Sequence, residues 1–368
     1  MYGKNLYSIK HHIQHTAYAR TDTSRTAYGI LYASTSDKTK KRGILSPSSK
    51  SVVKMSRRYP LFWWNVVAKV RKGRFGTMLG LTPEELRVGG TLRVEHVGGD
   101  ESVVSVEVPR WCCSASDGRL RLSAVLGIMD EASTYAGICV WDQGHRPGVS
   151  IQLEGRATHP QGFIDAGAGE RINIRTTKVK AGKTITFLKA SIERGTNVLA
   201  QCSHIKFMPM GFPLDHIFHP KVKNVSMPLV ERITRKIPLH DHAMPESIDD
   251  ILGLTDSTSS AATKAYSILV SEIHGNPMGN IHGGASVMLA ELAAEKRMPQ
   301  ICPHNTVRPI RIKSNLLNGI DCSSRQVAEI DITVGDRSGI QESNNTMHTT
   351  STVRNNGQMC SDTLIEWA

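Results

Sequence analysis

The sequence, 368 residues long, lacks any long uninterrupted apolar run, although 39% of its residues are hydrophobic. Its most apolar short stretch, residues 61–70, is about half as long as a helix that spans a bilayer must be. We therefore expect no transmembrane segment. A chain of this length and apolar content is expected to be globular, with enough residues for two ordinary domains.

Cysteine is also sparse. The chain has seven cysteines, and no two of them are separated by two residues as in common metal-binding and redox pairs. Two short clusters, His240-Asp241-His242 and Cys302-Pro303-His304, contain metal-ligand types, but neither has a partner at zinc spacing. A glycine-rich phosphate loop is missing too. The sequence thus predicts free thiols, no metal site and no bound cofactor.

Acidic residues are nearly missing from the first 75 positions, which contain 16 lysine and arginine residues but only Asp22 and Asp37 as acids. The rest of the chain has 29 basic and 31 acidic residues, so the net charge of +12 comes from this leader. A basic leader rich in serine, threonine and tyrosine is typical of organellar transit peptides, and we expect a mitochondrial location, with a cytoplasmic one as the alternative. A tail without a targeting role, a nucleic-acid-binding arm and an internal start at Met55 are the other interpretations.

An aromatic cluster, Phe62-Trp63-Trp64, follows the leader and is flanked by arginine and lysine residues. Such a segment could lie on a membrane or on another subunit, but more often it packs on its own domain. Residues 1 to about 55 carry no periodic apolar pattern, so we expect the folded body to be independent of them.

Two stretches of the chain share one pattern of secondary structure: an apolar strand, a helix with apolar residues at helical spacing, and four alternating strands. The first copy has a strand at 102–108, a buried helix over 122–139 and strands at 149–157, 171–179, 184–192 and 198–207. The second has a strand at 266–273, a helix over 285–297 that Pro299 ends, and strands at 307–316, 326–334, 346–353 and 359–367. The pattern Leu-Gly-Leu-Thr precedes both copies, at 79–82 and 252–255. It indicates an internal duplication of an α+β fold.

The predicted domain organisation follows from this repeat. Residues 1–75 form the basic leader, 76–208 the first unit, 209–249 a proline-rich linker and 250–368 the second unit. We expect the two units to pair within the chain with their sheets joined edge to edge, because an unpaired edge strand is a liability.

Chemically distinctive positions of the two copies align when the sequence is shifted by 161 residues. The shift places Gly118 on Gly279, Arg121 on His282, Leu122 and Ser123 on Gly283 and Gly284, and Asp130 on Glu291. In both copies the carboxylate lies about two and a half helical turns after the position of His282.

Gly283 and Gly284 stand at the entrance of the second helix. Backbone N–H groups there lack intrahelical partners and lie at the positive end of the helix dipole. An enzyme can use such groups to stabilise a carbonyl oxygen that gains negative charge. Glycine also allows a substrate to come close to the backbone. We therefore predict an oxyanion site at this helix start.

These residues resemble the hotdog-fold acyl-CoA thioesterases, whose motif has an Asn or Gln, a His-Gly-Gly segment and then an Asp or Glu. Asn276, His282-Gly283-Gly284 and Glu291 match it, and residues 282–291 are similar to the 4-hydroxybenzoyl-CoA and proofreading thioesterase branch. The first copy resembles the phenylacetate-pathway-type and animal medium- to long-chain branch through Asp130, Gly148-Val149-Ser150 and Lys180-Ala181-Gly182-Lys183-Thr184. The resemblance covers about residues 76–208 and 250–368.

The resemblance implies a double hotdog, in which each of two units has a central helix wrapped by an antiparallel sheet. It also implies an acyl-CoA thioesterase, acting on a fatty or aromatic acyl-CoA at a site that takes its oxyanion loop from one unit and its carboxylate from the other. The implied catalytic residues are Asp130, Ser150, Asn276, His282 and Gly283. Gly283 would polarise the thioester carbonyl, and Asp130 would attack it or activate a water. Asn276 and Ser150 would orient substrate or water, and His282 would brace the loop.

A second, degenerate site is expected around Glu291, which would face Ala115, Arg121 and Leu122 in place of an Asn, a His and a glycine pair. The family resemblance further implies a homodimer of double-hotdog chains, with an acyl-CoA substrate and no nucleic-acid partner.

Each site residue also has a purely structural interpretation. His282 could be a buried structural histidine, and Asp130 an acid on a helix surface beside Glu131. Lys180 and Lys183 could meet the phosphates of coenzyme A, but a solvated hairpin tip is the commoner role of such residues. The alternative function is that of a catalytically degenerate hotdog protein, serving as a scaffold or as a subunit of a larger mitochondrial assembly.

Overall fold

The computed structural model describes residues 60–66, 69, 75–78, 80–86, 90–142, 146–208, 223–237, 245–256, 265–302, 307–335 and 347–368. The basic leader up to residue 59, Met55 and the cluster His240-Asp241-His242 lie outside the described residues. All described residues belong to the unit Ser49–Ala368.

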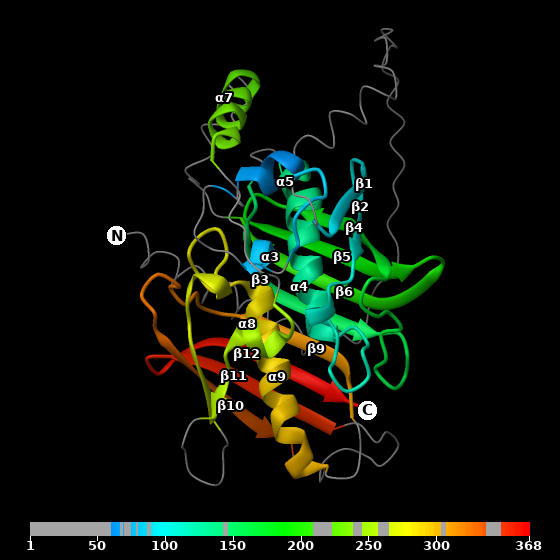
Figure 1. Cartoon of the computed structure of the whole chain (residues 1–368), viewed down its shortest axis with the longest axis vertical. Helices are drawn as coiled ribbons and strands as arrows, with labels where there is room; N and C mark the ends of the chain where they lie inside the picture. Colours follow the sequence, from blue (N-terminus) through cyan, green and yellow to red (C-terminus); the bar gives the residue numbers. More distant parts are fainter. Residues whose placement is uncertain are drawn as a thin grey trace, which may run out of the picture. The chain divides into compact units, whose positions relative to one another are not determined.

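Within the described residues, twelve strands form one antiparallel sheet (Figure 1). The first six are β1 (Leu92–Val97), β2 (Glu101–Glu107), β3 (Val149–Ala157), β4 (Arg171–Ala181), β5 (Ile185–Arg194) and β6 (Asn197–Phe207). The other six are β7 (Thr255–Asp256), β8 (Ala265–Leu269), β9 (Pro309–Leu316), β10 (Val327–Val334), β11 (Met347–Asn355) and β12 (Gln358–Trp367). The sheet and the helices that cover it confirm the α+β class.

The strand order repeats itself. It runs β1-β2-β4-β5-β6-β3 in the first half and continues β9-β12-β11-β10-β8-β7, which is the same order in reverse. The halves meet where β3 pairs with β9, from Gln152 opposite Asn315 to Arg156 opposite Arg311. This pairing confirms that the two copies join their sheets edge to edge, and it leaves neither central strand unpaired.

Two long helices lie against one face of the sheet (Figure 1). The first is α4 (Leu122–Ala132), which continues through a wider π-type turn, Ser133–Ile138, into α5 (Cys139–Trp141). The second is α9 (Gly283–Ile301). Apolar side chains of both helices are buried against inward-facing residues of the strands, which alternate with more exposed ones as in β11.

The helices α4 and α9 cross at a pair of glycines. A Cβ atom added to Gly284 would lie 2.6 Å from the Cα atom of Gly127, well inside van der Waals contact. One added to Gly127 would lie 2.6 Å from the Cε atom of Met288. Helix packing therefore accounts for Gly284, which the sequence interpretation had assigned to substrate approach together with Gly283.

The Leu-Gly-Leu-Thr repeats have the same local structure. Each follows or ends a short helix, α3 (Phe75–Met78) in the first copy and α8 (Ile248–Leu252) in the second. The glycine after each helix has positive φ, 70° at Gly80 and 58° at Gly253, which only glycine adopts without strain. The lead-in segments are therefore repeated together with the sheet.

Several predicted element boundaries are wrong. The helix α9 extends past Pro299, because a proline in the last turn removes only one intrahelical hydrogen bond. The strand predicted over 266–273 ends at Leu269 and is followed by a 3-10 turn, Glu272–His274. The proline-rich linker contains a helix, α7 (Lys223–Arg235), with Pro228 inside it. The strand β1 was not predicted, and a register shift between Val94 and His96 interrupts its alternation.

The aromatic cluster packs on its own domain. Phe62, Trp63 and Trp64 are 4%, 2% and 2% exposed, and the ring of Trp64 lies 5.2 Å from that of Tyr135. These side chains are therefore not available to a membrane or a partner. The packed body begins before the boundary predicted at residue 75.

Removing residues 1–54, so that the chain begins at Met55, should leave the midpoint of thermal unfolding unchanged. Trp63→Ala in the same shortened chain should lower the free energy of unfolding by about 3–5 kcal/mol, because it empties a buried aromatic site. A temperature scan monitored by circular dichroism measures the first, and denaturant unfolding measures the second. A collapse of the transition on truncation alone would show that the leader is part of the fold.

Candidate active site

The carboxylate of Asp130 lies on α4 with 2% of the residue exposed, and three side chains from the sheet surround its Oδ1 atom. The hydroxyl of Ser150, on β3, donates a hydrogen bond to it at 2.8 Å. The Nζ atom of Lys206 and the Nε2 atom of His204, both on β6, lie 3.5 Å and 3.3 Å away. Asp130 is therefore a buried acid held on one side by polar groups, and not an acid on a helix surface.

The pKa of Asp130 reflects two opposing effects. Burial alone would raise it, because it penalises the charged form. Lys206, His282, His204 and the hydrogen bond from Ser150 favour the charged form more strongly, and the net effect is a pKa well below the usual range. The carboxylate is therefore ionised at neutral pH, as a base or nucleophile must be.

The other oxygen of Asp130, Oδ2, faces the start of α9. A Cβ atom added to Gly283 would lie 2.9 Å from Oδ2 and 2.8 Å from the Cδ1 atom of Leu316. In the described part of the chain, no hydrogen bond is donated to Oδ2, and the Gly283 N–H donates none. The Oδ2 atom of Asp130, from the first half, thus lies near Gly283, from the second. Among the described residues, neither this oxygen nor the Gly283 N–H takes part in a hydrogen bond.

His282 braces this helix start. Its Nδ1 atom accepts a hydrogen bond from the Gly284 N–H at 3.0 Å, and its Nε2 atom lies 2.8 Å from the Oε1 atom of Glu131. Its ring stacks on that of Phe75, with centroids 4.8 Å apart. Burial lowers the pKa of His282, but the carboxylates of Asp130 and Glu131 outweigh it and raise the pKa above the usual value. Both contacts fit an imidazole whose hydrogen is on Nε2.

Asn276 shapes the loop ahead of the helix. Its side-chain oxygen accepts hydrogen bonds from the Met278 and Asn280 N–H groups, at 2.8 Å and 3.3 Å. Its Nδ2 atom lies 3.5 Å from the Ile281 carbonyl oxygen. The structure therefore brings together Asp130, Ser150, His282 and Gly283, while Asn276 contacts its own loop.

Aspartate, serine and histidine meet here, but not as a serine-hydrolase triad. Ser150 lies between the other two, donating to Asp130 and lying 3.0 Å from the Nε2 atom of His204. In a triad the histidine stands in the middle. His204 is completely buried, and this burial lowers its pKa to about 3 even though Asp130 favours the charged form. It is therefore neutral at neutral pH, and its place beside Ser150 is not that of the central histidine of a triad.

Sequence reasoning missed Glu131, His204 and Lys206 as parts of this site. Cys202, His204 and Lys206 occupy alternate positions of β6 and are all buried, so they share the inner face of the strand. A histidine and a lysine on the inner face of an otherwise apolar strand were the available signal. Polar residues there need partners, and a carboxylate is the natural one.

The second copy has a different arrangement around Glu291. Its Oε2 atom accepts a hydrogen bond from the Ser123 N–H at 2.8 Å, and Arg121 Nη1 lies 3.7 Å from its Oε1 atom. Arg121 also pairs with Glu295. Burial and then Glu295 raise the pKa of Glu291 to about 7, although Arg121 and Ser123 oppose this. Ala115 is exposed and is not one of these contacts.

The strand residues near Glu291 also differ from those near Asp130. Ser150 pairs with Lys206 across β3 and β6, and Pro309 pairs with Trp367 at the equivalent place across β9 and β12. Two residues before Trp367, Ile365 corresponds to His204. The second copy therefore has apolar side chains where the first has the polar groups that hold Asp130.

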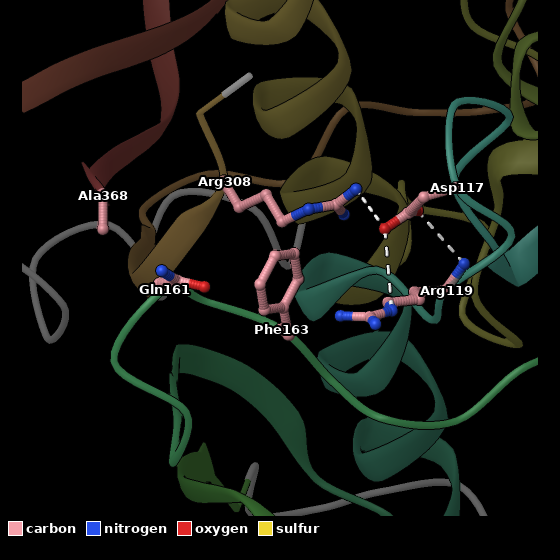
Figure 2. A pocket seen from close by; sticks show the side chains of 6 residues that line it. All are labelled: Asp117, Arg119, Gln161, Phe163, Arg308 and Ala368. Atoms are coloured by element: carbon pink, nitrogen blue, oxygen red, sulfur yellow. Dashed lines mark hydrogen bonds and ion pairs between the residues drawn. The ribbon is translucent and has the colours of Figure 1, made fainter. Parts of the chain in front are cut away.

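A separate cavity of about 570 Å³ lies at the loop before α4 (Figure 2). Its lining includes Phe163, whose ring has the guanidinium groups of Arg119 and Arg308 at 4.3 Å and 5.1 Å from its centre. Both arginines also form ion pairs with Asp117. Their charge is thus already partly neutralised, and none of the predicted site residues lines this cavity.

Two further findings concern only the ranges that the structure describes. Over those ranges, no group of three or more His, Cys, Asp or Glu side chains is placed to hold a metal ion. Among the helices of the same ranges, none is both long and apolar enough to cross a membrane.

No protein-family model and no curated protein sequence matches this chain. Solved structures similar to it include the acyl-CoA thioesterase II TesB2 from Mycobacterium marinum, 9% identical over 75% of this chain and 94% of that one, with a TM-score of 0.46. The 12:0-ACP thioesterase from Umbellularia californica is 10% identical over 74% and 99%, with a TM-score of 0.46. Zebrafish thioesterase superfamily member 2 is 24% identical over 38% and 95%, with a TM-score of 0.30. The function is therefore inferred from the residues of the site and not from these similarities.

Proposed function

We propose that this protein is an acyl-CoA thioesterase with one working site, formed by Asp130 and Ser150 of the first half and Gly283 and His282 of the second. The observation that carries the proposal is the position of the Asp130 Oδ2 atom beside Gly283. An ionised, otherwise unused carboxylate oxygen next to a free N–H at a helix start is what acyl transfer to water requires.

The architecture that we propose is a double hotdog. Two features support it: the strand order occurs twice, and each half contributes one long helix packed on the sheet. A site that combines the helix start of one unit with the helix carboxylate of the other is what this arrangement would produce.

In the hydrolysis that we propose, the Gly283 N–H donates a hydrogen bond to the thioester oxygen and stabilises the negative charge that develops there. In one route, Asp130 takes a proton from water as the water oxygen bonds to the carbonyl carbon. The C–S bond then breaks, and the proton passes to the thiolate, which leaves as the coenzyme A thiol. In the other route, Oδ2 itself bonds to the carbonyl carbon, the thiolate leaves, and water hydrolyses the mixed anhydride.

The fatty or aromatic acyl group, the mitochondrial location and the homodimer of double-hotdog chains stay part of this proposal. Lys180 and Lys183 are exposed at the tip of the hairpin between β4 and β5. A solvated hairpin tip is the commoner role of such residues, and contact with the phosphates of coenzyme A is the alternative.

The purified full chain should release free coenzyme A from at least one member of a panel of short-, medium-, long-chain and aromatic acyl-CoA esters. A thiol reagent that absorbs on reaction with coenzyme A measures the rate. The Asp130→Asn variant serves as the control for contaminating esterases. A well-folded protein that hydrolyses none of the panel would contradict the proposal and favour the scaffold alternative.

A further inference from the structure

We infer that Lys206 is a positioning residue of this site: it supplies the buried positive charge that keeps Asp130 ionised and turns its Oδ2 atom toward Gly283. Lys206 is 4% exposed, which is rare for lysine. Its Nζ atom lies 2.6 Å from the hydroxyl oxygen of Thr134 and 3.5 Å from the Oδ1 atom of Asp130. The effect on catalysis rests on the proposed function, whereas the charge pairing does not.

The position of Lys206 is fixed by the turn that follows Asp130. The hydroxyl of Thr134 donates to the backbone carbonyl of Asp130 at 2.5 Å, so its oxygen is free to accept a hydrogen bond from Lys206. The ammonium group is therefore held between Thr134 and the carboxylate. Together with Ser150 it occupies the Oδ1 side, which leaves Oδ2 toward α9.

Other titratable groups lie near this pair, and among the charges that favour ionised Asp130 that of Lys206 has the largest effect. They are His282 from α9, His204 from β6, and Glu131, Tyr135 and Cys139 from α4 and its continuation. The Nδ1 atom of His282, which faces Asp130, already accepts a hydrogen bond from Gly284. His204 is neutral, and burial raises the pKa of both Tyr135 and Cys139 well above their usual values, so they too are neutral.

The second copy provides an internal comparison. There the place of Lys206 is taken by Trp367, which is fully buried and donates its indole N–H to Thr349. The carboxylate of that copy, Glu291, is as deeply buried as Asp130. The pKa of Glu291 is raised to about 7, whereas that of Asp130 is lowered. Burial and the neighbouring Glu295 cause this rise and Arg121 opposes it, so the second copy has a cation near its carboxylate but none at the strand position of Lys206.

Lys206→Met should raise the pKa of Asp130, so the acid limb of the pH–rate profile should move upward by about one to three pH units. Activity at acid pH should fall and recover as the pH is raised to neutral, with KM little changed. Lys206→Arg should restore the wild-type limb. Lys189→Met, at an exposed lysine of β5 in the same sheet, is the matched control and should leave the limb in place. An unmoved limb in Lys206→Met would overturn the inference.

A second measurement is independent of activity. With Lys206 replaced by Met, the folded-state pKa of Asp130 rises toward its unfolded value, so the variant loses less stability than wild type on acidification. The difference in unfolding midpoint between wild type and Lys206→Met should therefore shrink as the pH falls from about 5 toward 3. Asp130→Asn in the Lys206→Met background should remove this dependence and should fold even if Lys206→Met does not, since no unpaired charge stays buried. A difference independent of pH, or a double variant no more stable than Lys206→Met, would contradict the charge pairing even if the chain hydrolyses no acyl-CoA.

Discussion

Asp130→Asn should lower kcat on the best acyl-CoA substrate by about two to four orders of magnitude, which is the usual cost of losing a general base or nucleophile. Asparagine has nearly the shape of aspartate, but its amide neither takes a proton from water nor attacks a carbonyl carbon. The KM should change little, because the role proposed for the buried Asp130 is in the chemical step and not in holding the body of the substrate.

The interpretation of this variant depends on its fold. Replacing Asp130 leaves Lys206 without its carboxylate partner, so the unfolding midpoint of Asp130→Asn must be measured beside the rate. Ser150→Ala is a useful companion, because it removes the 2.8 Å hydrogen bond to the carboxylate but leaves its charge. Its rate should lie between those of wild type and Asp130→Asn. A folded Asp130→Asn protein with wild-type turnover would show that the carboxylate is structural.

Gly283→Pro should lower kcat by about a hundred- to a thousandfold relative to Gly283→Ala, because one N–H donor to an oxyanion is worth that much. Alanine keeps this N–H and proline does not. Both add a Cβ atom near Asp130 and Leu316, where an ideal one would lie within 2.9 Å, so the crowding cancels in the comparison.

The backbone tolerates proline at this position. Gly283 is the first residue of α9, where proline is common, and His282 before it is already extended, with ψ at 142°. The measurement is the ratio of kcat between the two variants, each checked for its helix content. Equal rates in two folded proteins would mean that Gly283 does not donate to the substrate.

Much of the fold could be predicted because periodicity is a local property. The strand expected at 149–157 is found as Val149–Ala157, and β4, β5 and β6 begin within one residue of their predicted starts. Alternating valine and isoleucine reports a pleat with one buried face. Local patterns failed at Pro299 and Pro228, because tertiary packing keeps both prolines inside helices.

The site was predictable only where a motif is continuous or the duplication aligns it. His282 and Gly283 stand in one segment, and the shift by 161 residues identified Asp130. Lys206 is 76 residues from Asp130 and meets it through strand register, which no local pattern specifies. The residues that complete the site are therefore far apart in the sequence and come together only in the folded chain. Asn276 shows the converse, since it matches the motif and yet contacts its own loop.

A degenerate second site was expected because glycine and histidine are missing there, and the structure adds a further reason to expect it. The Ser123 N–H, which aligns with that of Gly284, donates to Glu291 itself, and Arg121 adds a charge beside it. The carboxylate of the second copy is therefore engaged within its own surroundings. Pro309 and Trp367 also stand there in place of Ser150 and Lys206.

The most direct test of a single working site is to compare kcat/KM of Asp130→Asn and Glu291→Gln on the same acyl-CoA, with both proteins folded. We predict that Glu291→Gln keeps most of the wild-type value, while Asp130→Asn loses about two to four orders of magnitude. A larger loss in Glu291→Gln than in Asp130→Asn would contradict the account, because it would place the working carboxylate in the second half of the chain.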